Sequence, residues 1–284
     1  MRRESAEQAA VGRCDVDVGD GLHLRVVSSA GDTPVLLLHG FTGSSETWAP
    51  LRDALGDGFA TLAVDLPGHG ASGAPDNPGR YALGRLAADL ARVLDAFGVE
   101  RGTVLGYSLG ARAALRFALD HPARVAALVL ESVSPGIVDP EERAARRASD
   151  AVLADAIERE GVAAFVDLWE QWPLFASQAA LSQATRERLR AQRLANRPRG
   201  LANSLRGAGA GAEAPIVEQL PTIGAPTLLV AGALDTKYVA LGQLMERLMP
   251  RARLSVVEGA GHAVHLEQPA VFAALVAEFL ESAR

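Results

Sequence analysis

The sequence has little cysteine, since Cys14 is the only one among 284 residues. A single thiol forms no internal disulfide, and it excludes a metal centre built on a cluster of cysteines. Long apolar runs are also missing, because no segment is long enough to span a bilayer. The first residues, Met1–Ser5, include charged side chains where a secretory signal needs an apolar segment. We therefore expect a soluble, cytoplasmic protein without a membrane partner.

Lysine is almost absent too, because Lys237 is the only lysine and arginine supplies nearly all of the positive charge. The formal net charge at pH 7 is -6, with 49% hydrophobic and 22% charged residues. This composition has neither the basic excess of a nucleic-acid-binding protein nor the low hydrophobicity of a disordered chain. A chain of this length can bury a full core as one large domain, with room for an insertion. The oligomeric state stays open.

Short apolar runs alternate with segments of helical periodicity, such as 81–97 and 109–119. The runs are continuous, which indicates strands buried on both faces and therefore a mostly parallel sheet flanked by helices, the α/β class. The first two strands differ, because the turn residues Gly19–Gly21 join them as a hairpin. The expected strands are Cys14–Val18, Leu22–Val27, Val35–Leu38, Ala60–Val64, Thr103–Leu105, Val125–Leu130, Thr227–Val230 and Leu254–Val257.

The strand pattern stops between Ser134 and Pro221. This stretch shows helical charge patterns and contains a segment rich in alanine and glycine, Gly207–Ala214, which we interpret as a flexible connector. Because the stretch lies between two expected strands of one sheet, we predict a helical cap inserted into the core. The predicted division is a core of residues 1–133 and 222–284 with a cap of residues 134–221.

Ser108 lies in Gly106–Gly110, a Gly-Tyr-Ser-Leu-Gly string between an apolar run and a helical segment. A serine on such a sharp strand-to-helix turn has its Oγ exposed for chemistry. A serine hydroxyl at its ordinary pKa is a poor base, so an imidazole must take its proton and an acid must orient the imidazole. A plain tight turn is the alternative interpretation of the string.

His262 and Asp235 are the predicted partners of Ser108. Each of the three residues follows an expected strand, and the carboxyl ends of parallel strands meet at one edge of a sheet. We therefore predict a catalytic triad in which Asp235 orients His262 and His262 takes the Ser108 proton. The lower-ranked alternatives are His265 for the base, and Asp65 or Glu258 for the acid.

Charge that develops on a substrate oxygen needs fixed donors, and backbone N–H groups usually supply them. Leu109 follows the serine at the start of a helix, where the helix dipole adds to the effect of its N–H group. Phe41 is the second predicted donor of this oxyanion hole. His39, two residues earlier, is expected chiefly to hold the loop, with a substrate contact as its other predicted role.

The sequence contains a set of motifs that follow expected strands, together with more specific segments around the insertion. These motifs are His39–Phe41, Asp65–Gly70, Gly106–Arg112, Glu131–Gly136, Glu142–Asp150, Trp169–Phe175, Asp235–Tyr238 and Gly261–His262. Together they resemble the α/β-hydrolase superfamily, whose triad follows the order serine, acid, histidine. The specific segments are similar to one family, the 2-succinyl-6-hydroxy-2,4-cyclohexadiene-1-carboxylate synthases of menaquinone biosynthesis.

This resemblance implies an α/β-hydrolase fold and a lyase that removes pyruvate from 2-succinyl-5-enolpyruvyl-6-hydroxy-3-cyclohexene-1-carboxylate. It implies the triad Ser108, Asp235 and His262, and substrate contacts from Tyr107, Arg112, Arg146, Trp169 and Arg193. The chemistry of these residue types agrees, because such a substrate has three carboxylates and the planar fork of arginine binds carboxylates bidentately.

Three of the implied contacts have plainer alternatives. Arg112 lies one helical turn after Ser108 on the same helix face, but it could form an ion pair. Arg146 could belong to a solvated helix face. Trp169 could pack in the apolar seam between cap and core.

We hypothesise that Ser108, deprotonated by His262, acts as a base on the ring carbon next to the succinyl ketone, without a covalent intermediate. The alternatives are a serine esterase or carbon–carbon bond hydrolase with Ser108 as nucleophile, and a non-catalytic ligand receptor on a hydrolase scaffold. The sequence contains neither a metal-ligand cluster nor a phosphate-binding glycine loop, so we expect no metal and no cofactor. The expected partner is a small-molecule tricarboxylate.

Overall fold

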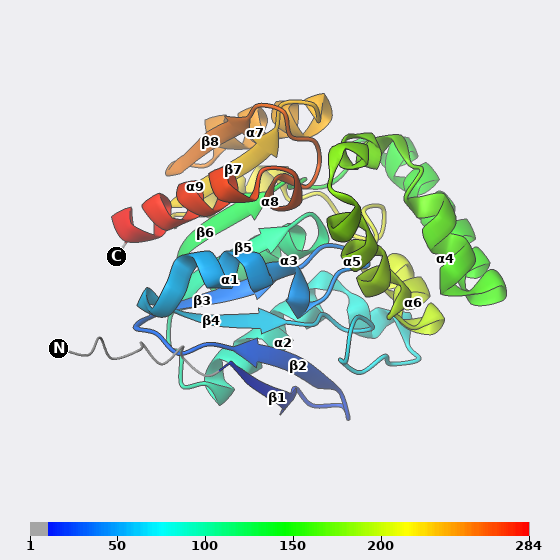
Figure 1. Ribbon diagram of the computed structural model, residues 1–284, viewed down its shortest axis with the longest axis horizontal. Coiled ribbons are helices and arrows are strands. Elements are labelled where there is room, and N and C mark those ends of the chain that lie inside the picture. The colour runs from blue at the N-terminus through cyan, green and yellow to red at the C-terminus, as the bar shows by residue number, and fades with distance from the viewer. Residues whose placement is uncertain (1–10, 284) are drawn as a thin grey trace.

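The computed structural model describes residues 11–283 (Figure 1). The segment Met1–Ser5, on which the expectation about a secretory signal depends, lies outside the described residues. Among residues 11–283, none of the helices combines the length and apolar content that a membrane crossing requires.

One eight-stranded sheet organises the described residues, in the order β1-β2-β4-β3-β5-β6-β7-β8. β1 pairs with β2, and β2 with β4, in antiparallel fashion, whereas all later pairs are parallel. The predicted α/β class, with a hairpin leading into a parallel sheet, is therefore confirmed. The strands are β1 (Gly12–Asp17), β2 (His23–Ser28), β3 (Thr33–Leu38), β4 (Phe59–Val64), β5 (Gly102–Tyr107), β6 (Val125–Glu131), β7 (Thr227–Gly232) and β8 (Ala252–Val257).

The hairpin turn between β1 and β2 has positive φ at Gly19, Asp20 and Gly21. Two glycines meet this requirement without steric cost, and aspartate tolerates the left-handed region better than most residues. Cys14 is exposed on β1, at the edge of the sheet.

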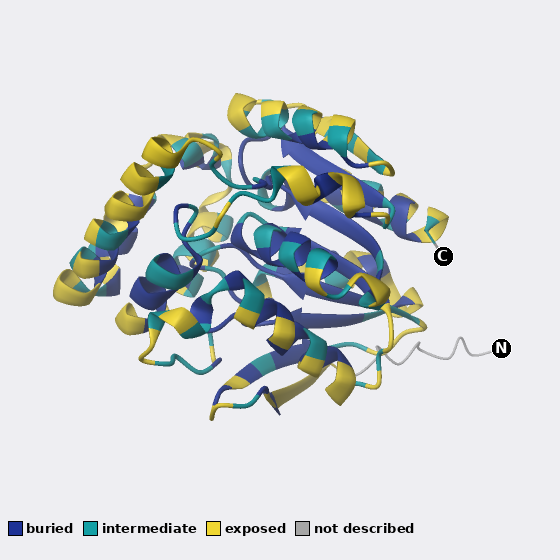
Figure 2. Cartoon of the chain, turned by 180° about the vertical axis from the view of Figure 1, so that it is seen from behind, coloured by how far each residue is buried: buried dark blue, intermediate teal, exposed yellow. Residues whose placement is uncertain are grey.

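Helices cover both faces of the sheet, and neighbouring strand residues alternate between the faces. Leu36 and Leu38 pack with α2 and α3, whereas Val35 and Leu37 pack with α1 and α9 (Figure 1). Figure 2 shows the central strands as dark blue, buried segments, whereas the edge strand β1 is mostly exposed. The helices are α1 (Ala49–Leu55), α2 (Leu83–Ala96), α3 (Leu109–Asp120), α4 (Pro140–Trp169), α5 (Gln183–Leu194), α6 (Pro198–Ala208), α7 (Thr236–Leu248), α8 (Val264–Glu267) and α9 (Pro269–Ser282).

Short 3₁₀ segments complete the structure. They are η1 (Ser45–Trp48), η2 (Gly56–Gly58), η3 (Pro78–Tyr81), η4 (Pro122–Arg124), η5 (Pro173–Ala180) and η6 (Val217–Thr222).

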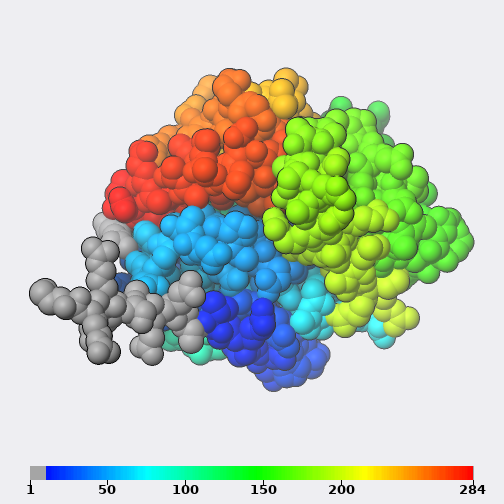
Figure 3. Space-filling model, in the orientation of Figure 1, coloured from blue at the N-terminus to red at the C-terminus, as the bar shows by residue number. Residues whose placement is uncertain are grey.

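The chain between β6 and β7 forms α4, α5 and α6, which lie together at one end of the molecule (Figure 3). A third apolar cluster, separate from the two of the sheet, joins α4 to α6 through residues such as Ile157, Phe165 and Leu201. The outward face of α4 is exposed (Figure 2). The predicted division into a core and a cap of residues 134–221 stays a prediction, but a largely independent cluster of apolar contacts agrees with it.

The interpretation of Gly207–Ala214 as a flexible connector is wrong for its first half. Gly207 and Ala208 end α6, and Ala208, Gly209 and Gly211 are buried. A Cβ at residue 211 would lie 2.5 Å from the backbone nitrogen of Arg147 in α4, so the small residues permit a close helix contact. Composition alone did not distinguish tight packing from flexibility.

Substitution of Phe117 tests the assignment of the core between the sheet and the helices α2 and α3. Phe117 is 0% exposed and belongs to the cluster that joins α2 and α3 to the sheet. We expect Phe117→Ala to lower the free energy of unfolding by about 3–5 kcal/mol, because it removes buried apolar surface and leaves a cavity. Urea denaturation measures this, with Val152→Ala on the exposed face of α4 as the control, expected to change stability by less than about 0.5 kcal/mol. Equal effects of the two substitutions would contradict this assignment of the core.

Candidate active site

Ser108 lies on a sharp turn between β5 and α3, with φ 51° and ψ -107°. This backbone conformation is costly for a residue with a Cβ, so the surroundings must enforce it. A Cβ at Gly106 would lie 2.4 Å from the carbonyl of Gly110, and one at Gly110 would lie 2.1 Å from the Leu38 oxygen. The two glycines therefore let the helix start directly against the strands. The string is a strand-to-helix elbow and not an ordinary tight turn.

The three predicted triad residues meet at the carboxyl edge of the sheet. His262 Nε2 lies 3.1 Å from Ser108 Oγ, and His262 Nδ1 lies 2.7 Å from Asp235 Oδ2. His262 and the Asp235 carboxylate are both almost fully buried. A carboxylate on Nδ1 favours the tautomer with the proton there, which leaves Nε2 free to accept the serine proton.

Backbone contacts fix the positions of the acid and the imidazole. Asp235 caps the N-terminus of α7, since its side chain accepts a hydrogen bond from the Tyr238 N–H. The Ser132 hydroxyl at the end of β6 donates to the His262 carbonyl at 2.8 Å. The Glu267 carboxylate accepts hydrogen bonds from the N–H groups of Gly261 and Ala263, on both sides of the histidine. The loop that carries His262 is therefore held in place by contacts other than the hydrogen bonds of the triad.

The predicted oxyanion-hole residues both line the cavity above Ser108. Neither the Phe41 N–H nor the Leu109 N–H is used in a backbone hydrogen bond within residues 11–283. Two free N–H groups beside a serine oxygen can stabilise a developing negative charge. The Phe41 ring packs edge-on against His69 and Trp169, which fixes the loop.

His39 corrects the predicted set of substrate contacts. It is 0% exposed and lies behind the loop: Nδ1 is 2.7 Å from the Gly40 oxygen, and Nε2 accepts from the Leu66 N–H at 3.0 Å. Both ring nitrogens are occupied by backbone groups, so His39 supports the oxyanion loop, its chiefly expected role. Asp65 is likewise structural, because its carboxylate accepts from the N–H groups of Ser45 and Ala71.

A cavity of about 160 Å³ opens above the triad. Its lining includes Ser108, His262, Phe41 and Leu109, together with every cap or elbow residue that the family resemblance implied. Those residues are Tyr107, Arg112, Arg146, Trp169 and Arg193. The cavity therefore combines the triad with three guanidinium groups drawn from α3, α4 and α5.

Arg112 and Arg146 have different partners. The Arg112 guanidinium donates to the carbonyls of Ala208 and Gly209 at 2.7 and 3.1 Å, and within residues 11–283 it forms no ion pair of the kind that the alternative interpretation expected. Burial lowers the pKa of Arg112, although an arginine stays charged at any ordinary pH. Arg146 forms an i,i+4 pair with Asp150 at 2.8 Å, and it is partly exposed. Both arginines line the cavity and stay charged, so each contributes positive charge to the cavity wall.

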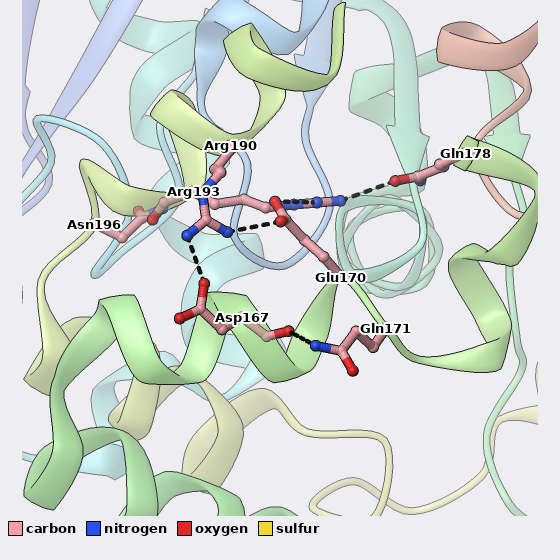
Figure 4. Close-up of polar contacts among 7 residues, drawn as sticks. All are labelled: Asp167, Glu170, Gln171, Gln178, Arg190, Arg193 and Asn196. Atoms are coloured by element: carbon pink, nitrogen blue, oxygen red, sulfur yellow. Dashed lines mark hydrogen bonds and ion pairs between the residues drawn. The ribbon is translucent and has the colours of Figure 1, made fainter. Parts of the chain in front are cut away.

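Arg193 is held within a network of the cap, which Figure 4 shows. Nη1 donates to Glu170 at 3.0 Å and Nη2 to Gln178 at 3.1 Å, while the guanidinium lies over the Phe175 ring. Arg190 holds the other oxygen of Glu170 at 2.8 Å. Arg193 Nε is buried and has no hydrogen-bond partner among the described residues, so it is free for a ligand.

Aromatic rings surround the imidazole. Tyr107 and Tyr238 lie against His262, and burial raises the pKa of both phenols, which keeps them neutral. Trp169 is in ring contact with Phe41, Phe165, Trp172 and Phe175. Trp169 therefore packs in the seam between cap and core and also lines the cavity, and its contact with a substrate stays a prediction.

The sequence did not reveal a second buried acid–histidine pair. His265 Nδ1 lies 2.8 Å from the carboxylate of Glu131, which is 0% exposed, and its backbone N–H donates to the same carboxylate. The hydrogen bonds to Glu131, rather than a contact with Ser108, therefore orient His265. Glu258, the weaker alternative for the acid, is exposed. The signal that could have found the pair is the position of Glu131 at the carboxyl end of β6.

The family described as alpha/beta hydrolase fold matches residues 33–269 of the chain. The chain therefore belongs to the α/β hydrolase fold family. It is 41% identical over 274 residues, covering 96% of its own length and 100% of the relative, to a Bacillus subtilis (strain 168) protein provisionally named 2-succinyl-6-hydroxy-2,4-cyclohexadiene-1-carboxylate synthase. A Klebsiella pneumoniae protein with this synthase name is 33% identical over 251 residues, which cover 87% of this chain and 94% of the relative.

Solved structures agree with this relationship. MenH from S. aureus superimposes with a TM-score of 0.87 at 30% identity, covering 91% of this chain and 98% of that one. A thermophilic esterase from Thermogutta terrifontis superimposes with a TM-score of 0.82 at 27% identity, covering 96% and 99% of the two chains. Within the α/β hydrolase fold, the sequence resemblance to the synthase family is thus confirmed.

His69 makes the loop behind the oxyanion hole sensitive to acid. Burial, with a smaller contribution from the neighbouring His39, lowers the pKa of His69 to about 3. In the unfolded chain a histidine titrates near about 6.5, so between these values the unfolded state binds more protons. The free energy of unfolding should therefore fall as the pH falls from about 6.5 toward 3, by up to about 1.4 kcal/mol per pH unit from this group.

Urea denaturation between pH 7 and pH 4 measures the slope of the free energy of unfolding against pH in the wild type and in His69→Asn. The asparagine amide can replace the contact of His69 Nδ1 with the Pro67 carbonyl. We expect the slope to be shallower in the variant. His23→Asn, at an exposed position, is the control and should keep the wild-type slope. An NMR titration that places the His69 pKa near 6.5 would contradict the prediction.

Proposed function

We propose that this protein eliminates pyruvate from 2-succinyl-5-enolpyruvyl-6-hydroxy-3-cyclohexene-1-carboxylate and forms 2-succinyl-6-hydroxy-2,4-cyclohexadiene-1-carboxylate, a step of menaquinone biosynthesis. The observation that carries the proposal is a hydrogen-bonded triad beneath three arginines in one cavity. A lyase acting on a tricarboxylate needs both a strong base and several cationic groups. The names of the relatives give the same activity.

The first step is proton transfer. His262 Nε2 accepts the Ser108 proton, and the Ser108 oxygen removes the ring proton on the carbon next to the succinyl ketone. Asp235 stabilises the imidazolium that results. The electron pair of the broken C–H bond moves into the ketone, which becomes an enolate.

The second step expels pyruvate. The enolate oxygen accepts hydrogen bonds from the N–H groups of Phe41 and Leu109, where the start of α3 also contributes its positive end. Electrons then return through the ring double bond and break the carbon–oxygen bond to the enolpyruvyl group. The leaving enolate takes up a proton from the imidazolium of His262 and becomes pyruvate. Atoms and charge balance without a covalent enzyme intermediate.

The three arginines are the proposed carboxylate contacts. Arg112 lies one helical turn from Ser108 and binds the carboxylate closest to the reacting carbon. Arg146 and Arg193 come from the cap and serve the more distant carboxylates. Tyr107 and Trp169 supply the walls of the site.

A serine esterase is the second candidate, because the distance from Ser108 Oγ to His262 Nε2 also suits a nucleophile and a structural neighbour is an esterase. The two candidates differ in the fate of Ser108. An esterase forms an acyl-serine, whereas the proposed lyase does not.

Ser108→Ala tests the role of the base. We expect it to lower kcat for pyruvate release by at least about 10²- to 10⁴-fold, the contribution typical of a positioned general base, with little change in substrate affinity. A coupled assay for pyruvate and mass spectrometry of the intact wild-type enzyme during turnover provide the measurement. Full activity of the variant, or a stoichiometric acyl-Ser108 species, would refute the mechanism.

Arg112→Ala tests carboxylate binding. Loss of a charge-assisted hydrogen bond should raise KM by about 10- to 100-fold. Arg116→Ala is a matched control, since Arg116 lies one turn further along α3 and pairs with Asp120. Its kinetics should stay at wild-type values. If the two variants had equal KM values, Arg112 would have no role in binding.

A further inference from the structure

Asp150 is an unexpected residue in a cavity that would take a tricarboxylate. It lies in α4, is only 4% exposed and lines the cavity. Oδ1 accepts a hydrogen bond from Arg146 Nε at 2.8 Å. Oδ2 is buried and has no hydrogen-bond partner among the described residues. A buried acceptor without a donor destabilises a protein by about 1–3 kcal/mol, and more when it is charged.

The backbone next to Oδ2 offers no donor. A Cβ at residue 209 would lie 2.6 Å from Oδ2, so a glycine is required for the carboxylate to approach the chain here. The Gly209 N–H already donates to the Leu205 carbonyl at 2.9 Å. Asp150 and Gly209 both line the cavity, so the buried, unpaired oxygen belongs to a residue of the cavity wall.

Two guanidinium groups lie close to the Asp150 side chain. Arg146 uses only Nε for Asp150, and its two Nη groups have no hydrogen bond to residues 11–283. Arg112 donates to the Gly209 carbonyl in the same turn. This end of the cavity therefore presents guanidinium edges for an anion and, next to them, one unpaired carboxylate oxygen for a hydrogen-bond donor.

We propose that Asp150 Oδ2 accepts a hydrogen bond from the ring hydroxyl of the substrate, while Arg146 binds the carboxylate beside it; this inference rests on the proposed function. In the product the hydroxyl is on ring carbon 6 and the carboxylate on ring carbon 1, so they occupy neighbouring carbons. Asp150 repels the carboxylate and accepts a hydrogen bond from the hydroxyl, whereas the Arg146 guanidinium binds the charged carboxylate more strongly than the neutral hydroxyl. The pair thus fixes which way round the ring binds, and with it which ring carbon faces Ser108.

The alternative is that Asp150 only orients the Arg146 guanidinium and does not contact the substrate hydroxyl. The two roles differ in which ligands lose affinity when Asp150 is replaced. An orienting role affects every ligand that uses the Arg146 guanidinium. A hydroxyl acceptor affects only ligands that carry the hydroxyl. The test compares two ligands, the product and 2-succinylbenzoate, which keeps both carboxylates and the ketone but lacks the ring hydroxyl.

The experiment measures the Kd of both ligands by calorimetry for the wild type, Asp150→Ala, Arg146→Ala and Asp155→Ala. We expect the ratio of the 2-succinylbenzoate Kd to the product Kd to fall about 10- to 100-fold in Asp150→Ala, the value of one hydrogen bond to a charged group. Arg146→Ala should weaken both ligands and leave the ratio unchanged. Asp155, an exposed acid of the same helix, is the matched control and should leave both Kd values unchanged.

An unchanged ratio in Asp150→Ala overturns the proposal, whether both ligands weaken equally or neither does. If Asp150→Ala does not fold, Asp150→Asn keeps the shape, and its weaker neutral acceptor should give a smaller fall in the same ratio. An unchanged ratio in that variant also overturns the proposal. Pyruvate release by the wild type is measured separately, so failure of the proposed function is distinguished from failure of this inference.

Discussion

The turn at Ser108 is the constraint on which the rest of the site depends. Gly106 and Gly110 let α3 begin in contact with β3, and this contact holds the serine in a backbone conformation that it would otherwise avoid. The neighbouring parallel strands β3, β5 and β6 are mostly buried and supply the rigidity that such strain needs. Because all parallel strands end at the same edge, the acid and the imidazole reach the serine from loops far away in sequence.

Charge in the cavity is arranged in pairs. The cap guanidinium groups of Arg146 and Arg193 are each held by a carboxylate, Asp150 in α4 and Glu170 directly after it, and Arg112 is held by backbone carbonyls. A planar guanidinium can be oriented by one partner and still present donors to a ligand. Such pairing reduces the cost of burying the cations before a ligand arrives, and it fixes the direction of each charge. Under the proposed function, this arrangement would recognise the pattern of the substrate carboxylates and not only their number.

Much of the fold could be predicted from the sequence. Apolar runs identify the strands, and Gly19–Gly21 identifies the hairpin, because both signals are local. Ser108, Asp235 and His262 were also predictable, since each follows a strand. The role of Gly207–Ala214 was not predictable, because an alanine- and glycine-rich segment has the same composition in a flexible linker and in a tight helix contact.

By itself the sequence determined the class of fold, the order of the strands along the chain and the residue types available for proton transfer and anion binding. Only the tertiary structure decided that His39 lies behind the loop, that Glu131 holds His265 and that Asp150 has a free oxygen at the cavity wall. The physical reason is that a local pattern reports which residues are apolar or turn-forming. Partners, burial and unpaired atoms depend on segments that are distant in the sequence, such as Glu131 and His265.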